Sequence, residues 1–272
     1  MHRLHPRLPA APRGHDTATA TITVVAQYHL GEADPGALVG NVADDPTVDS
    51  RGLLNLPRFG APVYTAGGSV SSPSPLAVHF AGSPDRFGAS TVLTSVTNNF
   101  GIEGWVKSDG NTSGVALLAY NGSSCCSGFG LYRNGASWGG LYGGITFVGA
   151  SAPVTTSWTH LALVCNNGMT TFYVNGQPNA NAAVTPHPAS TNSNGAMRIG
   201  GNVNSQGQPY EFFDGAVDEV RVFTFAPGQF SPQDLEFFQN ADHSIPTASL
   251  AGLSMLAALV LLGGIIVLRL RG

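Results

Sequence analysis

The sequence predicts an all-β fold, an antiparallel sandwich, for three reasons. Only 10% of the 272 residues are Asp, Glu, Lys or Arg, well below the usual share of about a quarter. Glycine is abundant, at 35 residues, and favours turns over helices. Short apolar stretches separated by turn-forming residues recur between residues 21 and 240, with no long helical period among them.

The first strand is expected over residues 22–30. Here Ile22, Val24, Ala26, Tyr28 and Leu30 alternate with a more polar set, the period of two that marks a half-buried strand. The turn-forming sequence at 34–36, Asp-Pro-Gly, follows. Residues 41–75 hold many Pro, Gly, Asp and Ser, so a long surface loop is expected there.

Further strands are predicted wherever apolar and β-branched residues cluster: 76–80, 100–107, 115–120, 129–133, 138–147, 158–165, 170–174, 197–199 and 216–223. Asn175-Gly176 is typical of a tight hairpin turn. A short helical turn is expected over 231–238, because Ser231 can cap it and Pro232 suits its first position.

Several of these segments, in this order and at this spacing, resemble the LamG-like jellyroll family, which has a concanavalin A-like sandwich fold. They are YHLGE at 28–32, FGIEGWVK at 100–107, WTHLALV at 158–164, TFYVNG at 171–176, IGG at 199–201 and FDGAVDEVRVF at 213–223. The resemblance implies an adhesive or carbohydrate-binding module, often with bound calcium.

Three carboxylates are candidate metal ligands. Asp218 is expected on an apolar strand face with Ala216, Val220 and Val222, where a carboxylate needs a hydrogen bond or a cation. Glu32 and Asp34 end the first strand, and the family implies that the first and last strands are neighbours. Calcium prefers such oxygen ligands. The alternative is that Asp218 binds backbone amides while the other two face solvent.

Catalysis is not expected. Adjacent strand residues point to opposite faces, so Asp218 and Glu219 should not converge as an acid–base pair. No E-x-D-x-x-E stretch gathers carboxylates on one strand face, and Glu103 stands alone between Gly101 and Trp105. We therefore expect a protein that is not an enzyme.

Two further residues are interpreted from their positions. His160 lies mid-strand on the face of Ala162 and Val164 and is expected to be a hydrogen-bonded core residue. Trp138 lies in a turn-rich stretch, so it is the tryptophan expected to be exposed and to stack on a sugar ring.

The three cysteines predict a disulfide rather than a zinc site, because no C-x-x-C pair exists. Cys125 and Cys126 are adjacent and bridge each other poorly. The predicted disulfide joins Cys165 with Cys125 or Cys126.

Residues 250–268 predict a transmembrane helix, because this stretch carries no charged side chain and spans about 28 Å as a helix. Arg269 and Arg271 form a basic tail at 269–272, which favours a cytoplasmic C-terminus and an extracytoplasmic domain, periplasmic or at the cell surface. Residues 1–20 are expected to be a disordered leader without a signal-peptide core. Either the span inserts as a tail anchor, or the start omits a signal peptide, which we favour.

The linker at 241–249 adds a second resemblance. Ile245, Pro246, Thr247, Ser249 and Gly252 are similar to the IPTL-CTERM sorting signal of bacterial surface proteins, although Ala248 and Ala251 replace the usual Leu and Trp. The resemblance implies export and a sorting enzyme that acts on this segment. The alternative is a plain membrane anchor.

Together these observations predict a surface-displayed binding or adhesion module that recognises a glycan or a partner protein. The alternatives are a structural surface component without a small ligand and a degenerate glycosidase-like domain. Nucleic acid is excluded as a partner, because the net charge is −4 and no basic stripe exists.

Overall fold

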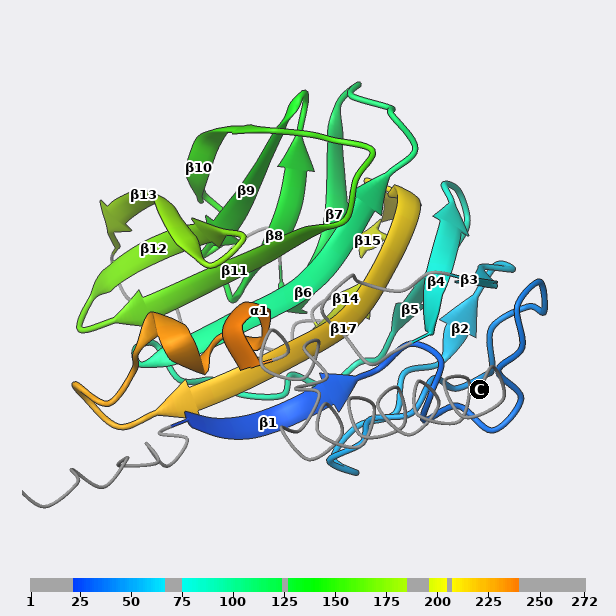
Figure 1. Cartoon of the computed structure of the whole chain (residues 1–272), viewed down its shortest axis with the longest axis horizontal. Coiled ribbons are helices and arrows are strands. Elements are labelled where there is room, and N and C mark those ends of the chain that lie inside the picture. The colour runs from blue at the N-terminus through cyan, green and yellow to red at the C-terminus, as the bar shows by residue number, and fades with distance from the viewer. Residues whose placement is uncertain (1–21, 67–74, 124–126, 185–195, 205–206, 240–272) are drawn as a thin grey trace, which may run out of the picture.

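The computed structural model describes residues 22–66, 75–123, 127–184, 196–204 and 207–239. Within them the chain forms two antiparallel β-sheets packed face to face, which confirms the predicted all-β sandwich (Figure 1). Pairing between neighbours is antiparallel throughout the described strands.

The eight-stranded sheet runs in the order β13-β12-β11-β6-β17-β4-β3, with β1 also paired to β17. Its long central strand, β17, takes β6 along one side and, along the other, β4 near its start and β1 near its end. First and last strands are therefore neighbours, as the family resemblance implied. The strand bounds are β1 Ile22–Tyr28, β3 Val63–Ala66, β4 Leu76–Ala81, β6 Phe100–Ser108, β11 Thr159–Asn166, β12 Met169–Val174, β13 Gln177–Ala183 and β17 Asp214–Phe225.

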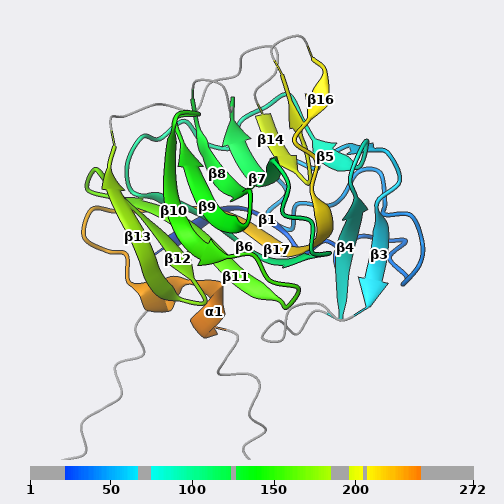
Figure 2. The ribbon, with the colours of Figure 1, turned by 90° about the horizontal axis from the view of Figure 1, so that it is seen from above.

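The seven-stranded sheet runs in the order β10-β9-β8-β7-β14-β5-β2. A small hairpin of two strands, β15 and β16, lies beside it (Figure 2). The strand bounds are β2 Arg58–Phe59, β5 Arg86–Gly88, β7 Val115–Gly122, β8 Phe129–Asn134, β9 Ser137–Tyr142, β10 Thr146–Pro153, β14 Ala196–Ile199, β15 Asn202–Val203 and β16 Pro209–Tyr210.

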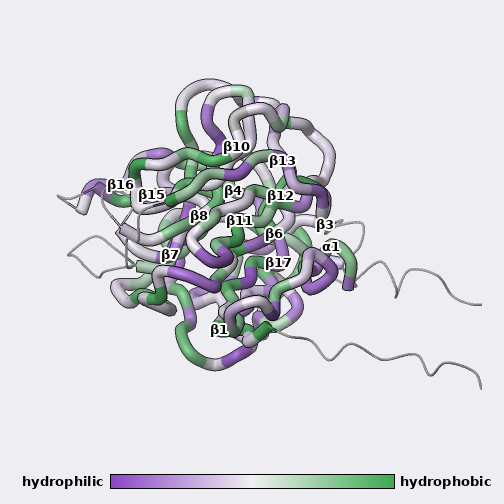
Figure 3. Tube along the Cα trace, turned by 90° about the vertical axis from the view of Figure 1, so that its left-hand side faces the viewer, coloured by the Kyte–Doolittle hydropathy of each residue, from purple (hydrophilic) through white to green (hydrophobic). Residues whose placement is uncertain are grey.

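The main hydrophobic core fills the space between the sheets. Alternate residues of each strand point inward, and the tube coloured by hydropathy shows apolar and polar positions interleaved along the strands (Figure 3). Phe100 of the eight-stranded sheet stacks on Phe129 of the other, with ring centroids 3.9 Å apart. Burial of such apolar area is the main force that holds the sheets together.

The outer face of the eight-stranded sheet is covered by the end of the described chain. Here η1, Pro232–Asp234, and α1, Glu236–Gln239, lie on the side away from the other sheet (Figure 2). The predicted helical turn is confirmed, and Ser231 caps it by accepting a hydrogen bond from the N–H of Gln233. Beneath it, Gly101 leaves room for the ring of Phe223, whose Cζ would lie 2.2 Å from an added Cβ.

Two expectations about loops were wrong. Residues 41–75 are not all loop, because β2 and β3 lie within them. Residues 138–147 are not one strand, because a turn at 143–145 separates β9 from β10. Strands β5, β13, β15 and β16 were also not predicted. Most of these elements are short or polar, so they carry little alternating pattern.

Among the described residues, no helix is long and apolar enough to cross a membrane. The predicted leader 1–20, the linker 241–249, the span 250–268 and the tail 269–272 lie outside the described residues. Cys125 and Cys126 also lie outside them, so the predicted disulfide stays a prediction. Cys165 is described, is fully buried at the end of β11, and has its Sγ 3.6 Å from the Asn98 side-chain oxygen.

Candidate functional site

Three carboxylates converge where the first and last strands meet. Glu32 follows β1, while Asp218 and Glu219 lie in β17, and one oxygen from each lies within 4.8 Å of the others. Asp218 and Glu219 are buried and Glu32 is exposed, so the cluster opens to solvent on one side. The predicted approach of Glu32 and Asp218 is confirmed.

A β-bulge brings Asp218 and Glu219 together. Opposite Trp105 and Glu103 of β6, the strand β17 pairs through Asp218 and Arg221, so it holds one extra residue. Glu219 absorbs the irregularity with a φ of 50°, a left-handed conformation that is rare for a residue of its kind. The expectation that Asp218 and Glu219 point to opposite faces was therefore wrong.

The same bulge corrects the expected neighbours of Asp218. Val220 and Val222 point into the core between the sheets, whereas Asp218 lies across from Trp105 on the outer face. A strict period of two would place all three on one face. Because of the extra residue, the side chains after the bulge point to the opposite face from the one that a strict alternation would give them.

Asp34 does not join the cluster, contrary to the prediction. Its carboxylate accepts hydrogen bonds from the Thr47 hydroxyl at 3.0 Å, the Val48 N–H at 2.7 Å and the Tyr64 hydroxyl at 2.8 Å. Burial nevertheless raises the pKa of Asp34, because it outweighs these three hydrogen bonds. Asp34 therefore organises the loop after β1, and Glu219 takes the place expected for it.

Neighbouring side chains fix the cluster. Nδ1 of His29 lies 2.8 Å from Oε2 of Glu219, and the Gln27 amide donates to the same oxygen at 3.2 Å. Glu32 accepts a hydrogen bond from the N–H of Leu76 at 2.9 Å. The hydrogen bond to Glu219 raises the pKa of His29, although burial acts against it.

A second network lies next to this cluster, beneath α1. Glu103 is fully buried and accepts hydrogen bonds from Arg221 Nε at 2.6 Å and from the N–H of Glu236 at 3.0 Å. His160 Nε2 also lies 3.0 Å from its carboxylate, which confirms His160 as a buried, hydrogen-bonded residue. Burial opposes the ionisation of Glu103, but Arg221 and His160 outweigh it and lower its pKa. Glu103 is the single carboxylate of β6, as expected, and its partners come from other elements.

Glu236 links the two groups of carboxylates. Its Oε1 accepts a hydrogen bond from the Gln27 amide at 2.8 Å. The same amide also donates to Glu219. Burial raises the pKa of Glu236 well above its usual value, and the nearby charges of Glu103, Glu219 and Asp218 add to the rise. This end of the sheet thus gathers the carboxyl groups of Glu32, Glu103, Asp218, Glu219 and Glu236, with Arg221 paired to Glu103 among them.

The donor set suits a divalent cation. Carboxylate oxygens are the ligands that hard cations such as calcium prefer, and three of them at this separation repel one another unless a cation or protons intervene. Glu32, Asp218 and Glu219 can therefore hold a metal ion at the meeting point of β1 and β17.

A different cluster occupies the outer face of the seven-stranded sheet. The Asn202 amide nitrogen lies 3.2 Å from the Tyr132 hydroxyl, 2.9 Å from the Tyr210 hydroxyl and 2.7 Å from Oε2 of Glu211. Phe147 crosses Tyr132 edge to face, with ring centroids 5.9 Å apart. Phe147 and Tyr210 keep 43% and 36% of their surfaces exposed, so aromatic rings border a set of hydrogen-bonding groups. We name this set the aromatic cluster.

Glu211 is the strained member of the aromatic cluster. Its φ is 51°, although it is neither glycine nor asparagine. Backbone strain of this kind persists where surrounding structure enforces it and is frequent at functional sites. Burial raises the pKa of Glu211, against the opposing effects of Asn202 and Arg198. Sequence analysis missed this cluster, because its residues come from separate strands and form no local motif.

Trp138 is not exposed, contrary to the expectation. It is completely buried on β9, with its ring 6.2 Å from that of Phe213 in the core. The glycine-rich stretch around it is strand β9 rather than a loop, because Gly139 and Gly140 allow close approach of the Gly149 carbonyl and of Leu163. Trp138 therefore serves the core rather than stacking on a ligand.

The fold agrees with solved structures of low sequence identity. Domain 4 of AbnA, an extracellular arabinanase from Geobacillus stearothermophilus solved with arabinotriose, is 19% identical, with a TM-score of 0.51 over 81% of this chain and 99% of that domain. Trypanosoma rangeli sialidase is 16% identical, with a TM-score of 0.56 over 89% of this chain. This chain covers 37% of the sialidase chain. No curated protein matches the sequence.

A family model gives the assignment. The Laminin_G_3 model, described as the concanavalin A-like lectin/glucanases superfamily, matches residues 83–229, more than half of the chain. The match covers β5 to β17 and so includes the segments that carried the LamG-like resemblance from residue 100 onward. The chain belongs to the concanavalin A-like lectin/glucanase superfamily.

Proposed function

We propose that this protein is a non-catalytic carbohydrate-binding module. The observation that carries the proposal is the aromatic cluster, where the exposed rings of Phe147 and Tyr210 and the half-buried carboxylate of Glu211 are held in place by the buried side chains of Tyr132 and Asn202. Sugar sites combine apolar ring faces, which pack on C–H groups, with a few polar groups that fix the hydroxyls.

The distribution of carboxylates supports a binding role rather than catalysis. The converging set, Glu32, Asp218 and Glu219, belongs to the outer side of the eight-stranded sheet, whereas the aromatic cluster lies outside the other sheet. Glycoside hydrolysis uses two carboxyl groups that flank one bond. In the described chain, Glu211 is the carboxylate of the aromatic cluster, and it already accepts a hydrogen bond from Asn202.

The likeness to the arabinanase domain guides the choice of the first ligand to test. That domain was solved with arabinotriose, and this chain matches nearly its whole length. Arabinotriose is therefore the first probe, followed by an array of neutral and acidic glycans.

The test is a titration of the full chain by isothermal calorimetry. We expect Tyr210→Ala to weaken binding of the glycan by about tenfold or more, because the variant loses both ring and hydroxyl. Leu53→Ala, which truncates an exposed apolar side chain in a separate loop, should leave the affinity unchanged. If the wild-type chain binds no glycan on the array, the proposal is wrong.

We propose in addition that calcium is the cation held by Glu32, Asp218 and Glu219. An all-oxygen donor set with three carboxylates favours calcium over softer metals. Such an ion would tie the loop after β1 to the bulge of β17 and so stabilise the sandwich where its first and last strands meet.

We further propose that the domain is displayed outside the cytoplasm and held to a membrane through residues 250–268. The uncharged stretch followed by Arg269 and Arg271 supports this placement.

A further inference from the structure

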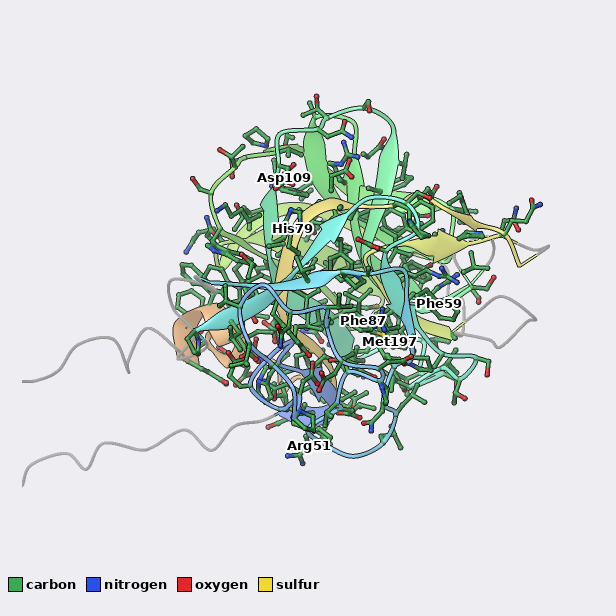
Figure 4. The ribbon with its side chains drawn as sticks, turned by 90° about the vertical axis from the view of Figure 1, so that its right-hand side faces the viewer. Arg51, Phe59, His79, Phe87, Asp109 and Met197 are labelled. Carbon is green, nitrogen blue, oxygen red and sulfur yellow. The ribbon has the colours of Figure 1, made fainter. Side chains whose placement is uncertain are left out.

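Arg86 is a buried cation on the outer face of the seven-stranded sheet. It belongs to β5 and pairs across from Phe59 of β2. Its neighbour Phe87 lies in the core, so Arg86 points the opposite way. Figure 4 labels Phe59 and Phe87. Only 9% of Arg86 is exposed. Its guanidinium carbon lies 3.8 Å from the centroid of the Phe59 ring, so the cation stacks on that ring.

Within the described part of the chain, no carboxylate or carbonyl oxygen accepts a hydrogen bond from Arg86. The other buried arginines all have such oxygens: Arg221 donates to Glu103 and to the Asp234 carbonyl, Arg133 to the Asn111 carbonyl, and Arg198 to the carbonyls of Gly122 and Val203. Buried charges are ordinarily paired, because loss of hydration is costly. Arg86 is the exception among them, because within the described residues its side-chain contact is with the Phe59 ring.

The surroundings of Arg86 add positive charge. Arg198 of β14 pairs across from Gly88, so it lies on the same outer face as Arg86. Burial lowers the pKa of Arg86, and the nearby charge of Arg198 lowers it further. Burial lowers the pKa of Arg198 as well, although nearby tyrosines and Glu211 act against that change. Among the described residues, no carboxylate forms an ion pair with Arg86.

The site also offers an apolar surface. An added Cβ at Gly201 would lie 3.2 Å from Cβ of Arg86 and 2.9 Å from the Phe212 ring, so only glycine lets these side chains approach. Phe59 keeps 42% of its surface exposed although Arg86 covers one part of the ring. A ligand can therefore contact the Phe59 ring while an acidic group reaches the guanidinium.

We propose that Arg86 binds the acidic group of an anionic saccharide, either the carboxylate of a sugar acid or a sulfate ester. A planar guanidinium with free N–H groups matches both oxyanions, because it donates two parallel hydrogen bonds to adjacent oxygens. The sugar ring packs against Phe59. This inference rests on the proposed glycan binding and assigns the chemical class of the glycan.

The experiment compares three monosaccharides that differ in charge. The full chain is titrated by calorimetry or NMR with methyl glucuronide, glucose 6-sulfate and neutral methyl glucoside. We expect one or both acidic sugars to bind more tightly than the neutral one, with binding weakened by added salt. The ratio between the two acidic sugars shows which oxyanion the site prefers.

Variants of Arg86 separate binding from structure. We expect Arg86→Gln to raise the Kd of the acidic sugar by about tenfold or more. Arg86→Lys keeps the charge but loses the planar guanidinium, so its Kd should lie between those of wild type and Arg86→Gln. Arg51→Gln is the matched control, because Arg51 is an exposed arginine on a loop far from Phe59 (Figure 4). A purely structural role would lower the melting temperature without changing the ratio of acidic to neutral affinity.

The outcomes distinguish this inference from the proposed function. Equal affinities for acidic and neutral sugars, or an unchanged Kd in Arg86→Gln, would overturn the role of Arg86 and leave carbohydrate binding standing. If no saccharide binds to the wild-type chain here or on the glycan array, both are wrong.

Discussion

Glu103 and Arg221 face each other directly across β6 and β17, and their side chains form an ion pair beneath the last turn of the described chain. Arg221 also donates to the carbonyl of Asp234 at 2.8 Å, while Glu103 accepts from the N–H of Glu236. The pair therefore does more than neutralise two buried charges. It fastens the segment after β17 to the outer face of the eight-stranded sheet.

Removal of Arg221 should destabilise the domain strongly. Arg221→Met leaves the Glu103 carboxylate buried without its main cation, a change that typically costs about 3–5 kcal/mol of unfolding free energy. Urea unfolding measures the loss. Glu103→Gln in the same chain should recover part of it, because the unpaired charge is then gone. Arg51→Met, at an exposed position, should change stability by no more than about 0.5 kcal/mol.

Calcium should raise the melting temperature of the protein. An ion that binds only the folded state stabilises it in proportion to the logarithm of its excess over the dissociation constant, which we expect to be about 10⁻⁴–10⁻³ M. Asp218→Asn should remove most of the shift, since it keeps the shape of the side chain and loses its charge. Glu219→Gln should act in the same way.

Thermal scans with calcium or with a chelator decide this. Asp109→Asn is the control, because Asp109 contacts His79 at 2.7 Å and is not a member of the carboxylate cluster. An equal shift in Asp218→Asn and in wild type would show that the cluster does not hold the ion.

Much of the fold follows from local pattern. The period of two in 22–30 predicts a half-buried strand, and the apolar stretches at 100–107 and 158–165 predict strands that are buried on both faces; the structure contains all three. Ser231 and Pro232 likewise predict the final turn from capping chemistry alone. Where the local residue pattern decides the backbone conformation, the sequence alone predicts the element.

The details of the sites do not follow from local pattern. The convergence of Asp218 and Glu219 depends on a bulge, which no periodic rule foresees in a strand of ordinary composition. The exclusion of Asp34 depends on Tyr64 and Thr47, which reach it from other parts of the chain. Arg86 is notable because its guanidinium stacks on Phe59 and forms no ion pair with another described residue, and that is a property of the folded surroundings rather than of the sequence.

Deletion of residues 245–272 should release a folded, soluble domain. The described strands and the final turn end at Gln239, so every contact of the sandwich described above is retained. The full chain should fractionate with membranes because of residues 250–268. Circular dichroism of the truncated chain tests the boundary, and absence of a cooperative unfolding transition would show that the domain extends further.

Glu211 should make stability depend on pH. Burial raises its pKa, so the folded state binds a proton more readily than the unfolded state does. Its contribution to stability is therefore complete below the unfolded pKa, about 4.3, and is lost as pH rises through the higher folded pKa.

Glu211→Gln lacks this titration, and its amide oxygen can still accept a hydrogen bond from Asn202. We expect Glu211→Gln to gain stability relative to wild type as pH rises from about 4 to about 7.5. Urea unfolding of both proteins at the two pH values, with a chelator present so that metal binding makes no contribution, measures the difference. An identical difference at both pH values would show that Glu211 titrates as an ordinary exposed carboxylate and that the strained loop does not bury its charge.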